Sequence, residues 1–317
     1  MDELWNLLWD EVEGPEDYPN ARPLLAHYTS AVTAEAILRG KELWLSHPIL
    51  MNDVEELQWG IREAIKILST HKGVETACGS YDRFDRFINL FQEHVDLYDH
   101  GHARSLFAAC FSMHEEGDGD GILSMWRAYG SNGEGVAIVF DTAKITPQDD
   151  SPFILGPVKY CLPGEREALI RKEIEKIADF FLRKLSEIGD KKMGLSASYL
   201  LEKIKFISLT TKHCGFKEEN EWRLIYFSER DSENLFENYV DYAAGVTGFQ
   251  PKLKIPLDGR VSWIPNLSDL IAEIILGPSH GSVLAINAFE RMLDKSDLGS
   301  VKSRVRRSTI PFRSRGF

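Results

Sequence analysis

The sequence predicts an α+β protein with a mixed, largely antiparallel and split β-sheet, flanking helices and a helical insertion. Two observations carry this prediction. Short apolar runs of strand length alternate with longer segments in which apolar residues recur at helical spacing. A long helical pair then interrupts the strand pattern, which resumes after it.

The elements follow from these patterns in chain order. Leu4, Trp5, Leu8 and Val12 fall close to helical spacing, so residues 1–20 are expected to form a capping helix and its turn. Residues 21–317 are expected to form a single α+β domain with a helical insertion at about 165–209. Strands are expected at 24–28, 42–46, 105–112, 135–141, 222–227, 252–257 and 271–278, and helices at 33–38, 55–68, 83–98, 122–130, 165–188 and 196–209.

Composition excludes several classes of protein. Hydrophobic residues make up 43% of the 317 residues, and no apolar run approaches the roughly 18 to 20 residues of a membrane span. The acidic start, MDELWNLLWDEVEGPED, has neither the basic region nor the cleavage site of a signal peptide, so a cytoplasmic location without membrane partners is expected. Four widely spaced cysteines favour reduced, structural thiols over a disulfide framework or a zinc ribbon.

Charge is unevenly distributed along the chain. The net charge is −12, yet residues 301–317 hold six basic residues and no acidic one. An acidic protein does not attract nucleic acid in general, although a local basic groove could. The favoured interpretation is a C-terminal strand edged with solvated charge.

The segment HYTS comes at the end of a strand, where sites are often built. Alternation places His27 and Thr29 on one face and Tyr28 on the other. A histidine at such a place is either a hydrogen-bonded structural residue or part of a site.

The stretch MNDVEE gathers acidic residues just before a helix. Asn52 or Asp53 as N-cap, with Glu55 or Glu56 in the first turn, explains it structurally. The functional alternative is that Asp53 and Glu56 hold a hard metal ion.

The segment KHCGFKEENEWRLIYF carries the densest charge cluster, from Lys212 to Arg223. In a strand, Glu219, Glu221 and Arg223 share one face, which predicts an ion pair in the simplest interpretation. Alternatively, a carboxylate there is positioned against a sugar hydroxyl, and Arg223 holds it or binds phosphate.

Two motif-like stretches carry no site. Gly130, Gly133 and Gly135 run from helix to strand, whereas a dinucleotide fingerprint runs from strand to helix. The loop HEEGDGDG lacks the bidentate glutamate of a calcium loop, because the twelfth position counted from Asp118 is Tyr129.

The segments HYTS, AILRGKELWLS, MND with EE, CFS, WRAYG, GVAIVFD, KEENEWRLIYF, IILGP and STIPFR together resemble the bacterial family named domain of unknown function 2971, over about residues 24–314. That family name implies no activity. A second resemblance does imply one. The opening, a strand ending in His-x-Thr, a helix before Gly40 and a strand beginning Glu-Leu-Trp, resembles the NAD-binding start of ADP-ribosyltransferases, including their DNA-modifying toxin branch.

This second resemblance implies roles for particular residues. His27 would bind the nicotinamide ribose beside Tyr28 and Thr29, and Glu221 would act on the ribose or on the incoming nucleophile. Trp44 or Tyr28 would flank the nicotinamide. The basic side chains expected to hold the pyrophosphate are Arg127 and Arg223.

The implied function is an NAD-consuming ADP-ribosyltransferase-like enzyme, with a toxin or phage-defence effector as its suggested role. It would cleave the nicotinamide–ribose bond and transfer ADP-ribose to a protein or nucleic acid, with NAD as co-substrate and no metal. The chemistry is coherent, because a nearby carboxylate can stabilise the oxocarbenium character that develops while a histidine fixes the sugar. The Ser-Thr-Ser strand pattern of the arginine-modifying branch is absent, so the type of target does not transfer.

Two other functions stay open. One is a metal-dependent nuclease or phosphoesterase built from Asp53, Glu56, Glu219 and Glu221. The other is a non-catalytic sensor that binds a nucleotide or partner in the same place.

Overall fold

The computed structural model describes residues 2–9, 15–51, 54–101, 106–148, 151–245, 248–279 and 283–312. For residues 54–56, 99–101, 185 and 245 it describes only the backbone. The chain divides into two compact units. The helical unit comprises residues 1–17, 48–103 and 158–217, and the sheet unit comprises residues 18–47, 104–157 and 218–317.

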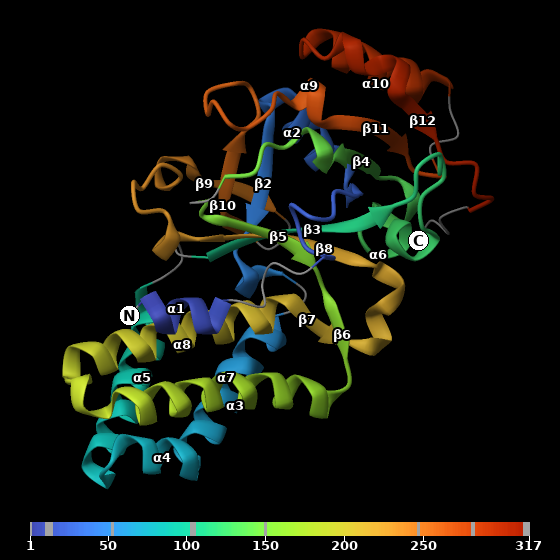
Figure 1. The fold of residues 1–317 in the computed structure, drawn as a ribbon. Coiled ribbons are helices and arrows are strands. Elements are labelled where there is room, and N and C mark those ends of the chain that lie inside the picture. Colours follow the sequence, from blue (N-terminus) through green and yellow to red (C-terminus); the bar gives the residue numbers. More distant parts are fainter. Residues whose placement is uncertain are drawn as a thin grey trace. The chain divides into compact units, whose positions relative to one another are not determined.

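The helical unit contains the pair of long helices that the sequence predicts as an insertion, together with the helices before them (Figure 1). A short parallel pair of strands, β6 and β7, flanks the two long helices. Its helices and strands are α1 (Asp2–Trp9), α3 (Val54–Ser69), α4 (Lys72–Cys78), α5 (Tyr81–Gly101), β6 (Lys159–Cys161), α7 (Pro163–Lys184), α8 (Asp190–Thr210) and β7 (Thr211–His213).

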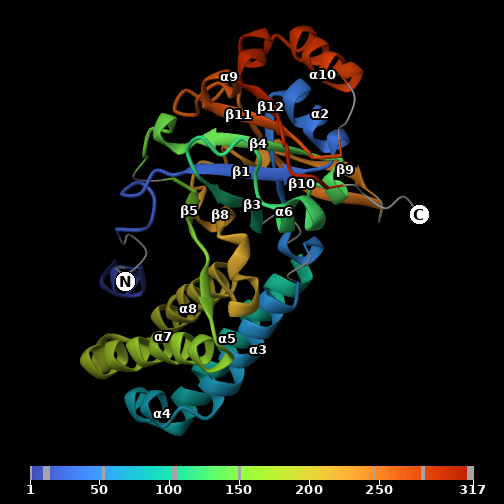
Figure 2. The same ribbon diagram turned by 90° about the vertical axis from the view of Figure 1, so that its right-hand side faces the viewer.

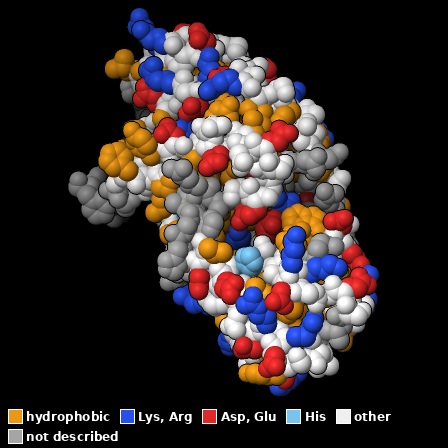
Figure 3. Space-filling model, turned by 90° about the vertical axis from the view of Figure 1, so that its left-hand side faces the viewer, with side chains coloured by type: hydrophobic (Ala, Val, Ile, Leu, Met, Phe, Trp, Pro, Cys, Tyr) orange, Lys and Arg blue, Asp and Glu red, His pale blue; other side chains and the backbone are white. Residues whose placement is uncertain are grey.

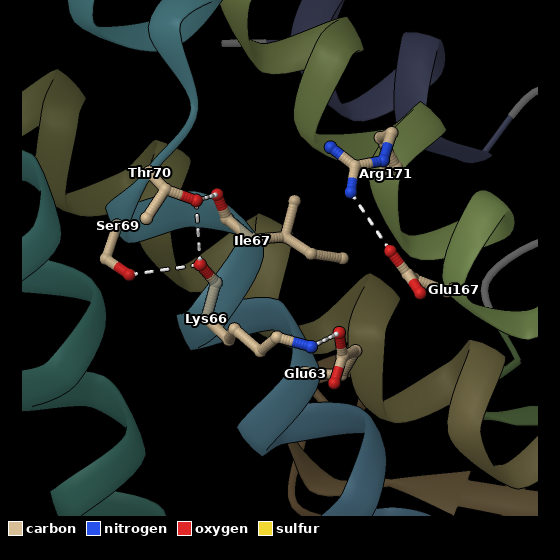
Figure 4. Close-up of polar contacts among 7 residues, drawn as sticks. All are labelled: Glu63, Lys66, Ile67, Ser69, Thr70, Glu167 and Arg171. Carbon is tan, nitrogen blue, oxygen red and sulfur yellow. Dashed lines mark hydrogen bonds and ion pairs between the residues drawn. The ribbon is translucent and has the colours of Figure 1, made fainter.

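Helix α3 ends where hydroxyl groups meet its last carbonyls (Figure 4). The Ser69 and Thr70 hydroxyls donate to the Lys66 carbonyl at 3.1 and 3.2 Å, which satisfies an acceptor that has no partner within the helix. The Lys66 ammonium also pairs with Glu63 at 2.8 Å. Such exposed pairs contribute little stability, so the apolar faces of the helices hold the unit together.

Helix α8 buries residues around most of its circumference, including charged ones. Lys203 and Lys205 are 4% and 3% exposed. Their ammonium groups lie 4.9 Å from the Trp9 ring centre and 5.0 Å from that of Tyr98, respectively. Aromatic faces attract desolvated cations, which is one way to accommodate lysine inside a helical unit.

The sheet unit contains the remaining strands, with helices on both faces. In Figure 2, α2 and α10 lie above strands β4 and β1, and α6 lies below them. Its elements are β1 (Leu24–Thr29), α2 (Ala31–Gly40), β2 (Glu42–Ser46), β3 (Leu106–His114), α6 (Leu123–Ala128), β4 (Val136–Asp141), β5 (Phe153–Pro157), β8 (Glu221–Phe227), β9 (Val240–Gly245), β10 (Gly248–Pro256), α9 (Leu267–Leu270), β11 (Ile271–Leu276), α10 (Val283–Lys295) and β12 (Val305–Arg307).

The large sheet is mixed and mostly antiparallel, which confirms the predicted α+β class. Its main path runs β12-β11-β4-β1-β3-β2-β10-β9, and a branch through β8 and β5 starts from β3. Among the described strands of this sheet, only β11 and β12 pair in parallel. The sheet is open, because β9 and β12 form the two ends of the path.

Each face of the sheet carries its own apolar cluster. The larger core cluster includes Leu25, Phe111 and Trp222 and is covered by apolar residues of α2 and α10. The smaller core cluster includes Ala26, Tyr28, Trp126, Ala137, Val139 and Ile275. Because successive strand residues alternate between faces, membership of a cluster shows which way each strand position points.

Short and half-exposed elements escaped the sequence analysis. It predicts no strands for β5 and β9 and no helix for α10, and it begins α8 about six residues too late, at Ser196. Strand β9 is largely exposed, so it lacks the apolar alternation that identifies a half-buried strand.

Basic residues near the C-terminus are held by local acceptors. The Arg304 guanidinium donates to the carbonyls of Ile271 and Ser268, and Lys302 pairs with Asp294 at 2.8 Å. Charges of both signs are interspersed over the face shown in Figure 3. Within the described residues, no helix is both long and apolar enough to cross a membrane.

Candidate functional site

The sheet splits along one edge of β3. One edge of β3 pairs with a single strand, β8, from Leu106 to Ser112. The opposite edge of β3 pairs with two strands, β1 and β2, and there the sheet splits. Strand β1 pairs with residues 112–114 of β3, and β2 pairs with it at Ala108. Between them lies Cys110, and β2 runs steeply across the direction of β3 and β4 (Figure 1). We call this divergence of β1 and β2 the split.

His27 lies at the split. Its Nδ1 donates to the Cys110 carbonyl at 3.0 Å, and its ring centre is 5.7 Å from that of Phe111. Burial lowers the pKa of His27, the hydrogen bond to Cys110 opposes this, and the charge of Lys252 lowers the pKa further. The imidazole is therefore neutral near pH 7, and because Nδ1 carries the proton, Nε2 is a hydrogen-bond acceptor.

The two neighbours of His27 have different environments. Tyr28 is 6% exposed, accepts a hydrogen bond from the Ile122 amide at 2.9 Å and packs edge-on against Trp126 at 4.9 Å. Burial raises the pKa of Tyr28 to about 12, so this phenol is a structural group. Thr29, partly buried, ends β1 opposite Val136.

Trp44 lies on β2, opposite Lys254 of β10. Its Nε1 donates to a Glu42 carboxylate oxygen at 3.3 Å, and the Lys254 ammonium lies 5.0 Å from the ring centre. Of the two aromatic residues considered for the nicotinamide, Tyr28 is buried and Trp44 is partly exposed.

Glu221 and Arg223 form a buried bidentate ion pair at the start of β8. The Arg223 Nε and Nη2 atoms lie 2.6 and 3.1 Å from the two Glu221 carboxylate oxygens. The two residues are 4% and 1% exposed. The structure thus contains the ion pair that spacing by two predicts, and each charge compensates the other where neither is well hydrated.

Two other residues of the charge cluster have contacts of their own. Tyr129 donates to a Glu219 carboxylate oxygen at 3.1 Å, and the Ser112 hydroxyl donates to the Glu219 carbonyl at 2.6 Å. Lys212 belongs to the helical unit, where its ammonium lies 4.7 Å from the Phe216 ring centre.

Arg127 does not join the group at the split. Its side chain is exposed, and its guanidinium lies 5.2 Å from the ring centre of Phe312, near the end of the described chain. This stacking accounts for its position on α6 without a ligand.

The register places His27 and Glu221 on opposite faces of the sheet. His27 pairs with Ile138, which belongs to the larger core cluster. Glu221 pairs with Ser112, and Ser112 pairs with Ala26 of the smaller core cluster. Residues opposite one another in an antiparallel pair share a face, so the two proposed catalytic side chains point away from each other.

The structure adds Lys252 and Ser46, which the sequence analysis did not select. They are opposite one another on β10 and β2, and the Lys252 ammonium donates to the Ser46 hydroxyl at 2.7 Å. Burial lowers the pKa of Lys252. The alternation in KLKIPL shows that Lys252 and Lys254 share a face, but only the pairing of distant strands brings Ser46 to one of them.

The metal-site alternative is not assembled by the described side chains. Asp53 lies outside the described residues, as does the side chain of Glu56, and so does the N-cap suggested at Asn52. Across the described part of the chain, no group of three or more His, Cys, Asp or Glu side chains is arranged to hold a metal ion. The four cysteines are unpaired with one another, which agrees with reduced thiols.

Comparison with curated proteins gives no match, and neither does comparison with solved structures. The family comparison does give one. The matched segment begins within α6 and runs through β4 to β6, α7, α8 and β7 to the start of β8. It therefore includes Glu221 and Arg223 but not His27. Residues 125–224 match the model of the family described as "Protein of unknown function (DUF2971)", which confirms the resemblance predicted from the sequence.

Proposed function

We propose that this protein is an NAD-consuming, ADP-ribosyltransferase-like enzyme whose nicotinamide ribose binds at the split. The observation that carries the proposal is the neutral His27 imidazole, held by the Cys110 carbonyl so that Nε2 accepts a hydrogen bond. A ribose hydroxyl is a suitable donor to such an acceptor.

The reaction would break the bond between ribose C1′ and the nicotinamide nitrogen, and its electron pair would leave with nicotinamide. A new bond would form between C1′ and an oxygen or nitrogen of the acceptor, which loses a proton to solvent or to a basic group. Water as the acceptor makes the protein an NAD glycohydrolase, and a protein or nucleic-acid group makes it a transferase. His27 would position the sugar. Trp44 is the less buried of the two aromatic candidates for the base, but its strand position, like that of Ser46 and Ala108, lies on the face of the sheet opposite to His27.

Two observations count against a catalytic role for Glu221. Its carboxylate already binds Arg223, and its strand position faces away from His27. This favours Glu221 and Arg223 as a pair that holds β8 in place. It also favours a second candidate function, a sensor that binds NAD or a related nucleotide without cleaving it.

Nicotinamide release from NAD tests the proposal. Purified wild type, His27→Ala and Glu221→Ala are incubated with NAD, with and without added protein extract or nucleic acid, and free nicotinamide is quantified. The enzymatic function is supported if the wild type releases nicotinamide and His27→Ala does not, provided that the variant unfolds at the wild-type temperature. Binding of NAD without release supports the sensor, and the absence of both contradicts the proposal.

The same assay addresses Glu221. If Glu221→Ala stays folded and loses release while retaining NAD binding, the carboxylate is needed for the chemical step despite its orientation. If it loses stability and release together, it has the structural role that its ion pair indicates.

A further inference from the structure

Two of the four cysteines come together in the helical unit, although both long helices separate them in the chain. Cys161 ends β6, and Cys214 directly follows β7. The parallel register of these strands sets Cys161 opposite His213, the residue before Cys214. Adjacent strands lie about 4.8 Å apart and rise about 3.3 Å per residue, which places the two cysteine Cα atoms roughly 6 Å apart. A disulfide bridges that separation.

The turn after β7 holds Cys214 beside the end of β6. The Gly215 amide donates to Nδ1 of His213 at 3.1 Å, a contact that spans Cys214 and fixes the chain on both sides of it. The Cys161 thiol donates to the Lys159 carbonyl at 3.8 Å, which is a weak hydrogen bond. Both cysteines are free thiols in this structure.

The two thiols differ in exposure. Cys161 is 2% exposed, whereas Cys214 is partly exposed. Burial raises the pKa of Cys161, the positive charges of Lys159 and Arg166 oppose this, and the nearby Cys214 raises the pKa further. Because the thiolate is the reactive form, a thiol buried in this way is a poor first target for an oxidant. Oxidation should therefore begin at Cys214, with Cys161 placed to complete the disulfide.

We propose that Cys161 and Cys214 form a reversible disulfide when the protein meets hydrogen peroxide. The Cys214 thiolate attacks one peroxide oxygen, so that an S–O bond forms, the O–O bond breaks and the other oxygen takes a proton and leaves as water. The Cys161 sulfur then attacks the Cys214 sulfenic acid. The S–S bond forms, the S–O bond breaks, and the leaving hydroxide takes the Cys161 proton. Together the thiols lose two electrons, which reduce the peroxide to two waters, and a thiol reductant reverses the change.

The bond would close the chain around the α7–α8 pair. Cys161 precedes α7, and Cys214 follows α8 and β7. A disulfide across such a long loop restricts the unfolded chain, so the oxidised protein should resist unfolding better than the reduced one. Cys78 is the matched control in the same unit, because it is also buried but ends α4 rather than one of these paired strands.

Peptide mapping after oxidation tests the disulfide. The full-length protein is treated with hydrogen peroxide, remaining thiols are blocked with iodoacetamide, and tryptic peptides with and without a reductant are compared by mass spectrometry. We expect one reducible cross-link, between the peptides of Cys161 and Cys214, while Cys78 and Cys110 carry the blocking group. The number of thiols that react in denaturant should fall from four to two.

Variants test the order of oxidation. Cys161→Ser should leave a sulfenic acid on Cys214, which dimedone labels, because no second thiol removes it. Cys214→Ser should show neither the cross-link nor a label at Cys161, and Cys78→Ser should form the cross-link as the wild type does. If Cys161→Ser does not fold, because its position is buried, Cys214→Ser still tests the pair at a partly exposed position.

Three mapping results would overturn the proposal. They are the absence of the cross-link in oxidised wild type, a cross-link that joins either cysteine to Cys78, Cys110 or a second copy of the chain, and loss of the cross-link in Cys78→Ser.

Thermal unfolding gives an independent readout. Oxidised wild type should melt several degrees above reduced wild type, and Cys214→Ser should show no such rise. Equal melting temperatures for both forms of the wild type would contradict a bond that ties the ends of the helical pair. None of these readouts involves NAD, so their outcome is independent of the proposed function.

Discussion

The imidazole of His27 and the carboxylate of Glu221 lie on opposite faces of one sheet, with β3 between their strands. The sequence resemblance assigns both residues to one site. The pairing of β1, β3 and β8, however, places His27 on one face of the sheet and Glu221 on the other. His27 keeps a hydrogen-bonding atom for a ligand, whereas Glu221 has a guanidinium bound to both of its oxygens.

Glu221→Gln should destabilise the protein strongly. It removes the negative charge that binds the Arg223 guanidinium through both carboxylate oxygens, and breaking such a buried pair costs about 3–5 kcal/mol. Urea unfolding followed by circular dichroism measures the free energy of unfolding. Glu218→Gln, at an exposed position, should cost less than about 0.5 kcal/mol. The double variant Glu221→Gln with Arg223→Met should recover part of the lost free energy of unfolding. If Glu221→Gln alone lowers that free energy by less than about 1 kcal/mol, the pair does not stabilise the protein as proposed.

Stability should fall in acid partly because of His27. Its pKa in the folded state lies below the ordinary value of 6.5, so the unfolded chain takes up this proton first. The free energy of unfolding therefore decreases as the pH drops below about 6.5, and the loss is complete below the folded-state pKa. His27→Gln should show a smaller decrease between pH 8 and pH 5 than wild type in urea unfolding. Equal decreases would show that His27 is not protected from protonation.

Tyr28→Phe should lower the stability of the protein but leave its affinity for NAD unchanged. It removes the acceptor for the Ile122 amide, at a cost of about 1 kcal/mol, while the ring stays against Trp126. Trp44→Ala should raise the KM or dissociation constant for NAD several-fold. Titration of both variants with NAD makes the comparison, and a larger effect of Tyr28→Phe than of Trp44→Ala would reverse the assignment of the aromatic residue.

Gly135→Ala should disturb the end of β1. A Cβ at Gly135 would overlap the Thr29 carbonyl and lie 2.7 Å from the backbone carbon of Gly130. Both neighbours are backbone, so neither can move aside without shifting β1 or the turn that follows α6, and a loss of at least about 2 kcal/mol in unfolding free energy is expected. At Gly119, in the same unit, a Cβ would meet nothing within 4 Å, so Gly119→Ala is the control. Equal melting temperatures for both variants would contradict the packing.

Much of the fold was predictable because its signals are local. The run GVAIVFD forms the buried strand β4, and the alternation in ELWLS forms β2. The ion pair of Glu221 and Arg223 was also within reach, since residues two apart on a strand share a face. Strand β9 was missed because it lies exposed at the sheet edge and shows no apolar pattern.

The sequence by itself determined the α+β class, the position of His27 at the end of a strand and the resemblance confirmed over residues 125–224. Only the tertiary structure decided which side chains meet. The alignment of β1, β3 and β8 separates His27 from Glu221, and the pairing of β10 with β2 brings Lys252 to Ser46. The physical reason is that strand register depends on contacts between distant segments, and a shift of one residue turns every side chain to the other face.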